Sequence, residues 1–343
     1  MPYVFQLFAV LLEANPSPSL PPYYQSLMPP IIQPPLWESR GNVPALVRLL
    51  TALIPRGVEH ITSQSQIEPI LVIFQKLMSS KANEAYAFDL IEAIIDVFPV
   101  ATIQPYFPPL LTMLLTRLQS SNSPTFSLRF TKFYHFVSAR SVQGYGADLV
   151  ASTAEGIQAG VFPPLYLTII LPSTQKIARP IDRKIAVISL TNTLASSTAF
   201  AERYAKGWAF TCEALLKLLE NPPLPVDRDD PLTSIAVDDD SADLAFAVDF
   251  TQLVTCRRPF ADHDRWAEVR DVKPWVGSSL REANLKTDGR VRPVEPYPLT
   301  SPLSPTRTAN TSCLPPTQID KFVQERLSPE ARTVLVQYMA AYA

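Results

Sequence analysis

Helix-length runs of apolar residues recur along the first two thirds of the chain, about 40 residues apart, as in proteins built from paired helices. Runs begin near Pro44, Glu84, Thr125, Leu165 and Tyr204. Further runs lie between them and begin at Ile67, Pro105 and Ile181. This alternation predicts helix, turn and helix in succession rather than one compact globule.

The spacing of apolar residues within the runs fits one buried face per helix. In the segment 85–98, six apolar residues recur at the spacing of one helix face, namely Ala85, Phe88, Ile91, Ile94, Ile95 and Phe98. A helix pair of this kind gains a core only by stacking on its neighbours. We therefore predict an all-α fold, a HEAT-repeat α-solenoid of antiparallel helix pairs over residues 1–286. The apolar stretch Val4–Leu12 reads as an amphipathic helix ended by Asn15 and Pro16, since it lacks the basic start of a signal peptide.

The character of the chain changes after Asn221. Residues 222–243 form a Pro-rich and then acidic stretch, predicted to be a solvated loop within the solenoid. Short helices are expected at Leu244–Leu253 and Lys273–Lys286. Residues 287–316 are rich in Pro, Ser and Thr and are predicted to be disordered. In the segment 317–343, Ser328 followed by Pro329 predicts a C-terminal helix that caps the last repeat.

Composition excludes several classes of function. With 47% hydrophobic residues, 18% charged residues and a net charge of −2, the chain offers no basic surface for nucleic acid. No apolar run reaches the length that spans a membrane. The three cysteines Cys212, Cys256 and Cys313 are far apart, and the three histidines lack ligand spacing, so neither a disulfide framework nor a metal site is expected.

No catalytic or nucleotide-binding motif is present in the sequence. The nine glycines do not form a phosphate-binding loop, and no nucleophile elbow or zinc-protease motif occurs. We therefore expect neither enzymatic activity nor a cofactor, and Cys212 and His135 are expected to pack within helices.

Two sets of charged residues could bind another protein. The first is the acidic run Asp227, Asp229, Asp230, Asp238, Asp239, Asp240 and Asp243, which could attract a basic partner or simply keep a loop solvated. The second is a set of cations on alternate helices, namely Arg48, Arg129, Lys132, Arg183 and Lys184. These cations could line a concave binding face or could be solvated. Arg183 and Lys184, which follow Asp182 at the start of a predicted helix, could also link neighbouring repeats.

Four segments resemble a known family. They read FQLFAVLLE, YYQSLMPPIIQPPLWE and GNVPALVRLL near the start, and IDRKIAVISLTNTL from Ile181. In this order they are similar to the C-terminal part of the CAS exportins, a family of importin-alpha re-exporters within the importin-beta (karyopherin) superfamily. WAFTCEALLKLLE followed by an acidic stretch also fits. The resemblance covers about residues 1–285 and is most specific in 1–57 and 179–220.

The resemblance implies a function without catalysis. CAS exportins are HEAT-repeat superhelices that bind importin-alpha together with Ran in its GTP form and carry the complex through the nuclear pore. Such a carrier shuttles between nucleus and cytoplasm and can touch nuclear pore proteins. Complete members carry an additional N-terminal arch, so this chain is expected to correspond to the C-terminal arch. The alternative is a HEAT-repeat scaffold unrelated to Ran.

Overall fold

The computed structural model describes residues 2–121, 123–140, 144–221, 253, 264–285 and 323–341. The chain divides into two compact units. Unit 1 comprises residues 1–104 and 226–263, and unit 2 comprises residues 105–225 and 264–343. Where it is described, the chain is helical and contains no strand, which confirms the predicted all-α class. The predicted acidic loop 222–243, the helix expected at 244–253 and the segment 287–316 lie outside the described residues, except for Leu253.

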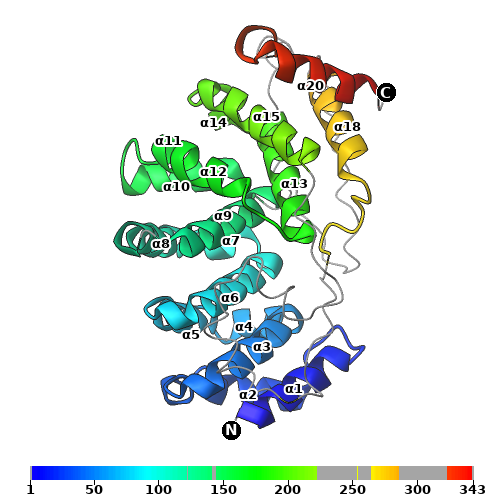
Figure 1. Cartoon of the computed structure of the whole chain (residues 1–343). Coiled ribbons are helices and arrows are strands. Elements are labelled where there is room, and N and C mark those ends of the chain that lie inside the picture. The colour runs from blue at the N-terminus through cyan, green and yellow to red at the C-terminus, as the bar shows by residue number, and fades with distance from the viewer. Residues whose placement is uncertain are drawn as a thin grey trace. The chain divides into compact units, whose positions relative to one another are not determined.

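Unit 1 is built on one layer of three helices, α1, α3 and α6, which lie side by side (Figure 1). The helix α5 packs against α6 to form a pair, as the sequence pattern predicts. The elements of the unit are α1 (Pro2–Ala14), α2 (Pro22–Ile31), η1 (Pro34–Trp37), η2 (Arg40–Asn42), α3 (Val43–Leu53), η3 (Ile54–Arg56), α4 (Val58–Ser63), α5 (Ile67–Met78), η4 (Lys81–Asn83), α6 (Glu84–Val97) and α7 (Val100–Ile103).

Unit 2 repeats this design with a layer of α9, α13 and α18. Against the first two of these helices pack α8, α12 and α15, and α20 closes the end of the unit against α15 and α18. The elements are α8 (Phe107–Ser121), α9 (Pro124–Ala139), α10 (Ala147–Ile157), α11 (Phe162–Pro164), η6 (Leu165–Ile170), α12 (Leu171–Thr174), α13 (Pro180–Ser196), α14 (Thr198–Ala201), α15 (Ala205–Glu220), α18 (Val272–Leu285) and α20 (Pro329–Ala341).

The burial pattern explains why these segments become helices of a layer. In α3 the apolar side chains are buried nearly all round, because the helix is covered by α1 on one side and by α6 on the other. In α8 the apolar side chains that recur at helical spacing are buried, namely Phe107, Leu110, Leu111, Leu114 and Leu118. Burial of each such side chain contributes about 1.5–3 kcal/mol to the stability of the folded state. The side chains buried between the helices of a layer and their neighbours therefore form the core of each unit.

Prolines set where several helices begin. Pro44, Pro124 and Pro180 each occupy the first turn of a helix, where the missing N–H has no partner to lose. Pro172 instead lies within the continuous helical stretch 162–174. Its ring cannot donate to the carbonyl of Thr168, and the turns just before it, η6, widen to a π-helix.

Candidate partner-binding face

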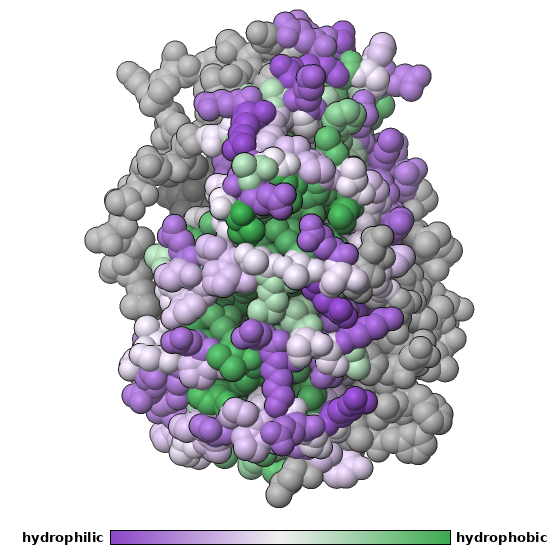
Figure 2. All heavy atoms as spheres, turned by 90° about the vertical axis from the view of Figure 1, so that its left-hand side faces the viewer, coloured by the Kyte–Doolittle hydropathy of each residue, from purple (hydrophilic) through white to green (hydrophobic). Residues whose placement is uncertain are grey.

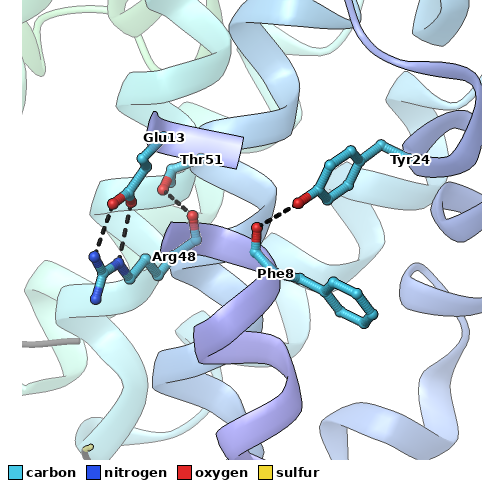
Figure 3. A network of polar contacts seen from close by, with 5 residues as sticks. All are labelled: Phe8, Glu13, Tyr24, Arg48 and Thr51. Atoms are coloured by element: carbon cyan, nitrogen blue, oxygen red, sulfur yellow. Dashed lines mark hydrogen bonds and ion pairs between the residues drawn. The ribbon is translucent and has the colours of Figure 1, made fainter. Parts of the chain in front are cut away.

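The helices α1 and α3 are joined by a bidentate ion pair in unit 1. The Nε and Nη2 atoms of Arg48 lie 3.0 and 2.7 Å from the two carboxylate oxygens of Glu13 (Figure 3). On the other side of α1, the hydroxyl of Tyr24 donates to the carbonyl of Phe8 at 2.7 Å (Figure 3). Arg48, which the sequence placed among the candidate binding residues, therefore fixes one helix of the layer to the next.

A second ion pair joins α9 to α13 in unit 2. Lys132 Nζ lies 3.0 Å from Asp182 Oδ2, and the guanidinium of Arg179 lies 3.9 Å from the same oxygen. The acidic residue that opens α13 thus meets a cation from the preceding helix of the layer. Such a contact favours the alternative in which charged residues at the start of this helix link neighbouring repeats.

Arg183 holds α13 to the end of α15. Its guanidinium donates to the carbonyl oxygens of Leu218 at 2.9 Å, Asn221 at 2.6 Å and Ile177 at 3.2 Å. The last carbonyls of a helix have no partner within it and carry partial negative charge, so a cation there is favourable. Burial lowers the pKa of the Arg183 guanidinium. Arginine nevertheless stays charged near neutral pH.

Lys184 holds the segment that leads into α18. Its Nζ lies 2.6 Å from Asp264 Oδ2, and Asp264 Oδ1 accepts from the backbone N–H of Trp266 at 3.0 Å. Asn221 and Asp264 flank residues 222–263, so two adjacent cations at the start of α13 contact both sides of that segment. The seven aspartates predicted to bind a partner lie within it, outside the described residues.

An aromatic cluster that sequence reasoning did not single out supports the same junction. Trp266 packs edge to face on Phe136, with 6.0 Å between ring centroids, and the guanidinium of Arg265 lies 5.0 Å from the centre of the Phe136 ring. Trp266 and Trp275 cover a small core of Ala139, Ile188 and Val269. Two tryptophans within a mixed-charge stretch were the available signal for such an anchor.

The candidate cations therefore form contacts within the chain. Arg48, Lys132, Arg183 and Lys184 each contact a neighbouring element, and these contacts favour the interpretation that they link repeats. Their predicted contact with a partner stays a prediction, as does that of the aspartates. Arg129, the remaining member of the set, also has an interaction within the chain.

Cys212 and His135 are titratable groups that lie buried in the core of unit 2. Cys212 is fully buried, and burial raises the pKa of its thiol, as expected of a structural cysteine. Burial lowers the pKa of His135 to about 3. Within the described ranges, no cluster of three or more His, Cys, Asp or Glu could hold a metal ion. Among the same residues, no helix is both long and apolar enough to cross a membrane.

Comparison with known proteins gives a consistent result. Residues 1–297 match the family described as CAS/CSE protein, C-terminus. The importin-alpha re-exporter of Schizosaccharomyces pombe is 36% identical over 295 residues, which are 85% of this chain and 30% of that protein. Exportin-2 of Xenopus laevis is 33% identical and Exportin-2 of Homo sapiens 32% identical, each over 85% of this chain and 29% of its own length.

A solved structure shares the fold. The exportin Cse1 in its cargo-free, cytoplasmic state matches with a TM-score of 0.70 and 23% identity, over 98% of this chain and 31% of that one. This likeness confirms the predicted solenoid class. The chain spans about 30% of the length of the relatives that it matches. On the strength of the match over residues 1–297, the chain belongs to the CAS/CSE family, whose C-terminal region it resembles.

Proposed function

We propose that this chain acts as the C-terminal part of a nuclear export receptor. In this role it binds importin-alpha together with Ran in its GTP form, and it helps to return importin-alpha to the cytoplasm. The match of residues 1–297 to the CAS/CSE family carries the proposal, because relatives in this family are importin-alpha re-exporters by name. The protein accordingly shuttles between nucleus and cytoplasm, touches nuclear pore proteins on its way, and performs no catalysis itself.

The architecture supports a role in binding large partners. In each layer an ion pair fixes the first two helices to one another, Arg48 with Glu13 in unit 1 and Lys132 with Asp182 in unit 2, so these two helices present one surface. Stacked helix pairs offer extended surfaces rather than a single pocket, and another folded protein can lie along them. A carrier needs such a surface, whereas an enzyme needs clustered titratable groups.

The test is binding to importin-alpha with and without Ran locked in the GTP form. We would measure it with this chain fused behind the part of the fission yeast re-exporter that precedes its matched residues. We expect importin-alpha to bind tightly only when Ran-GTP is present. A fusion that folds but does not bind importin-alpha with Ran-GTP would refute the proposal. Binding of equal strength without Ran would instead favour the scaffold unrelated to Ran.

Within this function, we propose that the acidic run Asp227–Asp243 meets a basic segment of importin-alpha. Contacts at the start of α13 support this proposal. Arg183 contacts Asn221 and Lys184 contacts Asp264, so the chain is attached to unit 2 both before and after the segment that contains the acidic run. Seven aspartates with a single arginine among them give a strongly negative stretch. Its attraction for a basic partner reaches over a Debye length of about 8 Å at physiological salt.

Charge neutralisation tests the role of the acidic run. The triple variant Asp238→Asn, Asp239→Asn and Asp240→Asn should bind importin-alpha more weakly, and its affinity should fall less steeply with salt, because fewer charges attract the partner. The matched control removes three exposed carboxylates elsewhere, through Glu59→Gln, Glu68→Gln and Glu202→Gln. Equal salt dependence in the wild type and both triple variants would eliminate this role.

A further inference from the structure

Several hydroxyl groups lie buried in the core of unit 2. Figure 2 shows the usual arrangement on one face of the molecule, where hydrophilic residues cover most of the surface and hydrophobic ones lie mainly between them. In unit 2, by contrast, α9, η6 and α13 each bring hydroxyls into the interior. Four of them concern us here, from Tyr134, Ser138, Tyr166 and Thr193, whose residues are only 1, 1, 2 and 2% exposed. We call these four groups the hydroxyl cluster.

Two members of the cluster have a proton to donate and no acceptor for it. The hydroxyls of Tyr134 and Ser138 have no hydrogen-bond partner among the described residues. The two residues are four positions apart on α9 and therefore lie on the same face of that helix. Burial raises the pKa of Tyr134, so its hydroxyl keeps its proton near neutral pH. A buried donor left in this state costs free energy, so both protons need an acceptor.

The other two members can only accept. The Thr193 hydroxyl donates its single proton to the carbonyl of Ser189 at 2.8 Å. The Thr211 hydroxyl donates to the carbonyl of Gly207 at 2.8 Å, so it must accept from the Tyr166 hydroxyl, which lies 2.7 Å away. Thr193 and Tyr166 therefore have oxygen lone pairs to offer but no proton.

These donors and acceptors lie around the Tyr134 hydroxyl. The helix α13 packs along α9 (Figure 1), and the ring of Tyr166 meets that of Tyr134 edge to face with 5.8 Å between centroids. The hydroxyls of Ser138, Thr193 and Tyr166 are close enough to Tyr134 to oppose the effect of burial on its pKa. None of them is at the distance of a direct hydrogen bond. Polar groups that face one another beyond that distance are commonly bridged by a water molecule.

We propose that the hydroxyl cluster binds one buried water molecule. The water accepts from Tyr134 and Ser138 and donates to Thr193 and Tyr166. Water offers two lone pairs and two protons, which is what two donors and two acceptors require, whereas a metal cation has no lone pair to offer and a simple anion has no proton. Bound in this way, the water joins α9, η6 and α13, and it belongs to the structure as buried waters generally do. This inference does not rest on the proposed export function.

Oxygen-17 magnetic relaxation dispersion tests the proposal directly, because it reports how many water molecules stay bound inside the protein in solution. The double variant Tyr134→Phe and Ser138→Ala of the whole chain removes both donors, and we expect it to hold one long-lived water fewer than the wild type. The matched control is Tyr24→Phe in unit 1. Its hydroxyl is also buried but donates directly to the carbonyl of Phe8 at 2.7 Å, so the number of bound waters should not change.

Thermal unfolding gives a second reading whose sign is decisive. If the water satisfies Tyr134, the single variant Tyr134→Phe should lower the melting temperature by about 2–4 °C, because a buried hydrogen bond is lost. If the hydroxyl has no partner, its removal leaves the melting temperature unchanged or raises it. Ser138→Ala, a smaller change, repeats this reading should circular dichroism show that the double variant loses helix content.

Three outcomes would overturn the inference. The first is a double variant that folds and holds as many long-lived waters as the wild type. The second is a melting temperature that neither Tyr134→Phe nor Ser138→Ala lowers. The third is a lower melting temperature with no loss of bound water, which would mean that the hydroxyls of the cluster bond to one another directly.

Discussion

At the scale of single residues, His135 shows how a polar side chain is accommodated in the core of unit 2. The Thr174 hydroxyl donates to the carbonyl of Ile170 at 2.7 Å, so it can only accept from His135 Nε2, which lies 2.8 Å away. The opposite nitrogen, Nδ1, then accepts from the Ser189 hydroxyl at 3.0 Å. This assigns the neutral tautomer with its proton on Nε2, and both ring nitrogens are satisfied.

This environment makes the stability of unit 2 depend on pH. Burial lowers the pKa of His135 to about 3, whereas an unfolded histidine titrates near 6.5. Below pH 6.5 the unfolded chain therefore binds a proton that the folded chain does not, and stability falls as the pH decreases toward 3. We expect His135 to remove about 2 kcal/mol of unfolding free energy between pH 7 and pH 5, and none above pH 7.

Urea unfolding at pH 7.5, 6.0 and 5.0 would measure this dependence. The comparison is with His135→Gln, which keeps a side chain able to form hydrogen bonds but does not titrate. Other groups contribute equally to both proteins, so the difference between the two pH profiles isolates His135. Parallel profiles would show that the imidazole titrates normally in the folded protein.

The sequence predicted the position of His135 in a helix but not its full burial. Its partners Thr174 and Ser189 are 39 and 54 residues away, and no local pattern reports such a distance in space. Ser189, Thr191 and Thr193 are likewise buried in α13, where a periodicity argument would place polar residues toward solvent. The hydroxyls of Thr191 and Thr193 are satisfied by carbonyls one turn earlier, so their burial is tolerated.

At the scale of elements, Asp148 of α10 stabilises the start of α14. Its carboxylate accepts from the backbone N–H of Thr198 at 2.9 Å, from that of Ala199 at 3.3 Å, and from the hydroxyls of Ser197 and Thr198. The first N–H groups of a helix have no partner within it, and a negative charge there also suits the helix dipole. One side chain thereby fixes a short helix 50 residues further along the chain.

Removing this carboxylate should loosen the connection between α13 and α15. We expect Asp148→Ala to lower the unfolding free energy by about 2 kcal/mol, the upper range for loss of a helix cap. Ser152→Ala, on an exposed position of the same helix, should change it by less than about 0.5 kcal/mol. Thermal unfolding followed by circular dichroism compares the two. Similar effects of both substitutions would mean that the Asp148 contacts contribute no stability.

The long helices could be predicted from the sequence, and the connections could not. Each apolar run identified by its period became a helix, from α3 at the predicted Pro44 run to α15 near Tyr204. The widened turn η6 was missed, because Pro172 acts on the backbone rather than on the pattern of side chains. The cap from Asp148 was missed for a different reason, since its partners meet only after α10 and α14 have packed.

The residues of the candidate site could be predicted from the sequence, but the groups that they contact could not. Charge and position identified Arg48, Arg183 and Lys184 as candidates on alternate helices, and the structure shows each contacting a neighbouring element. Sequence alone cannot tell a cation that pairs within the chain from one that faces a partner. That distinction depends on which acids and carbonyl groups the stacking of helices brings within reach.

At the scale of the whole chain, the last described helix lies beyond the family match. The matched region ends at residue 297, whereas α20 spans Pro329–Ala341. In unit 2 this helix packs on α15 and α18, and the hydroxyl of Tyr338 bonds Glu220 at the end of α15. The Nζ atom of Lys273 lies 5.9 Å from the centre of the Tyr338 ring. The helix therefore occupies the position of the predicted cap.

Leu335 and its neighbour Val336 provide a direct test of this capping role. Leu335 is 1% exposed, whereas Val336 is 50% exposed on the same turn of α20. If α20 covers the end of unit 2 as part of the cooperative fold, Leu335→Ala should cost about 2–4 kcal/mol of unfolding free energy, and Val336→Ala should cost less than about 0.5 kcal/mol. Urea unfolding monitored by tryptophan fluorescence would measure both, since Trp208 and Trp275 lie in elements that contact α20. An unchanged urea midpoint in Leu335→Ala would mean that α20 attaches and detaches without affecting the rest of unit 2. If α20 unfolds cooperatively with the helices on which it packs, weakening its contacts must lower the stability of those helices as well.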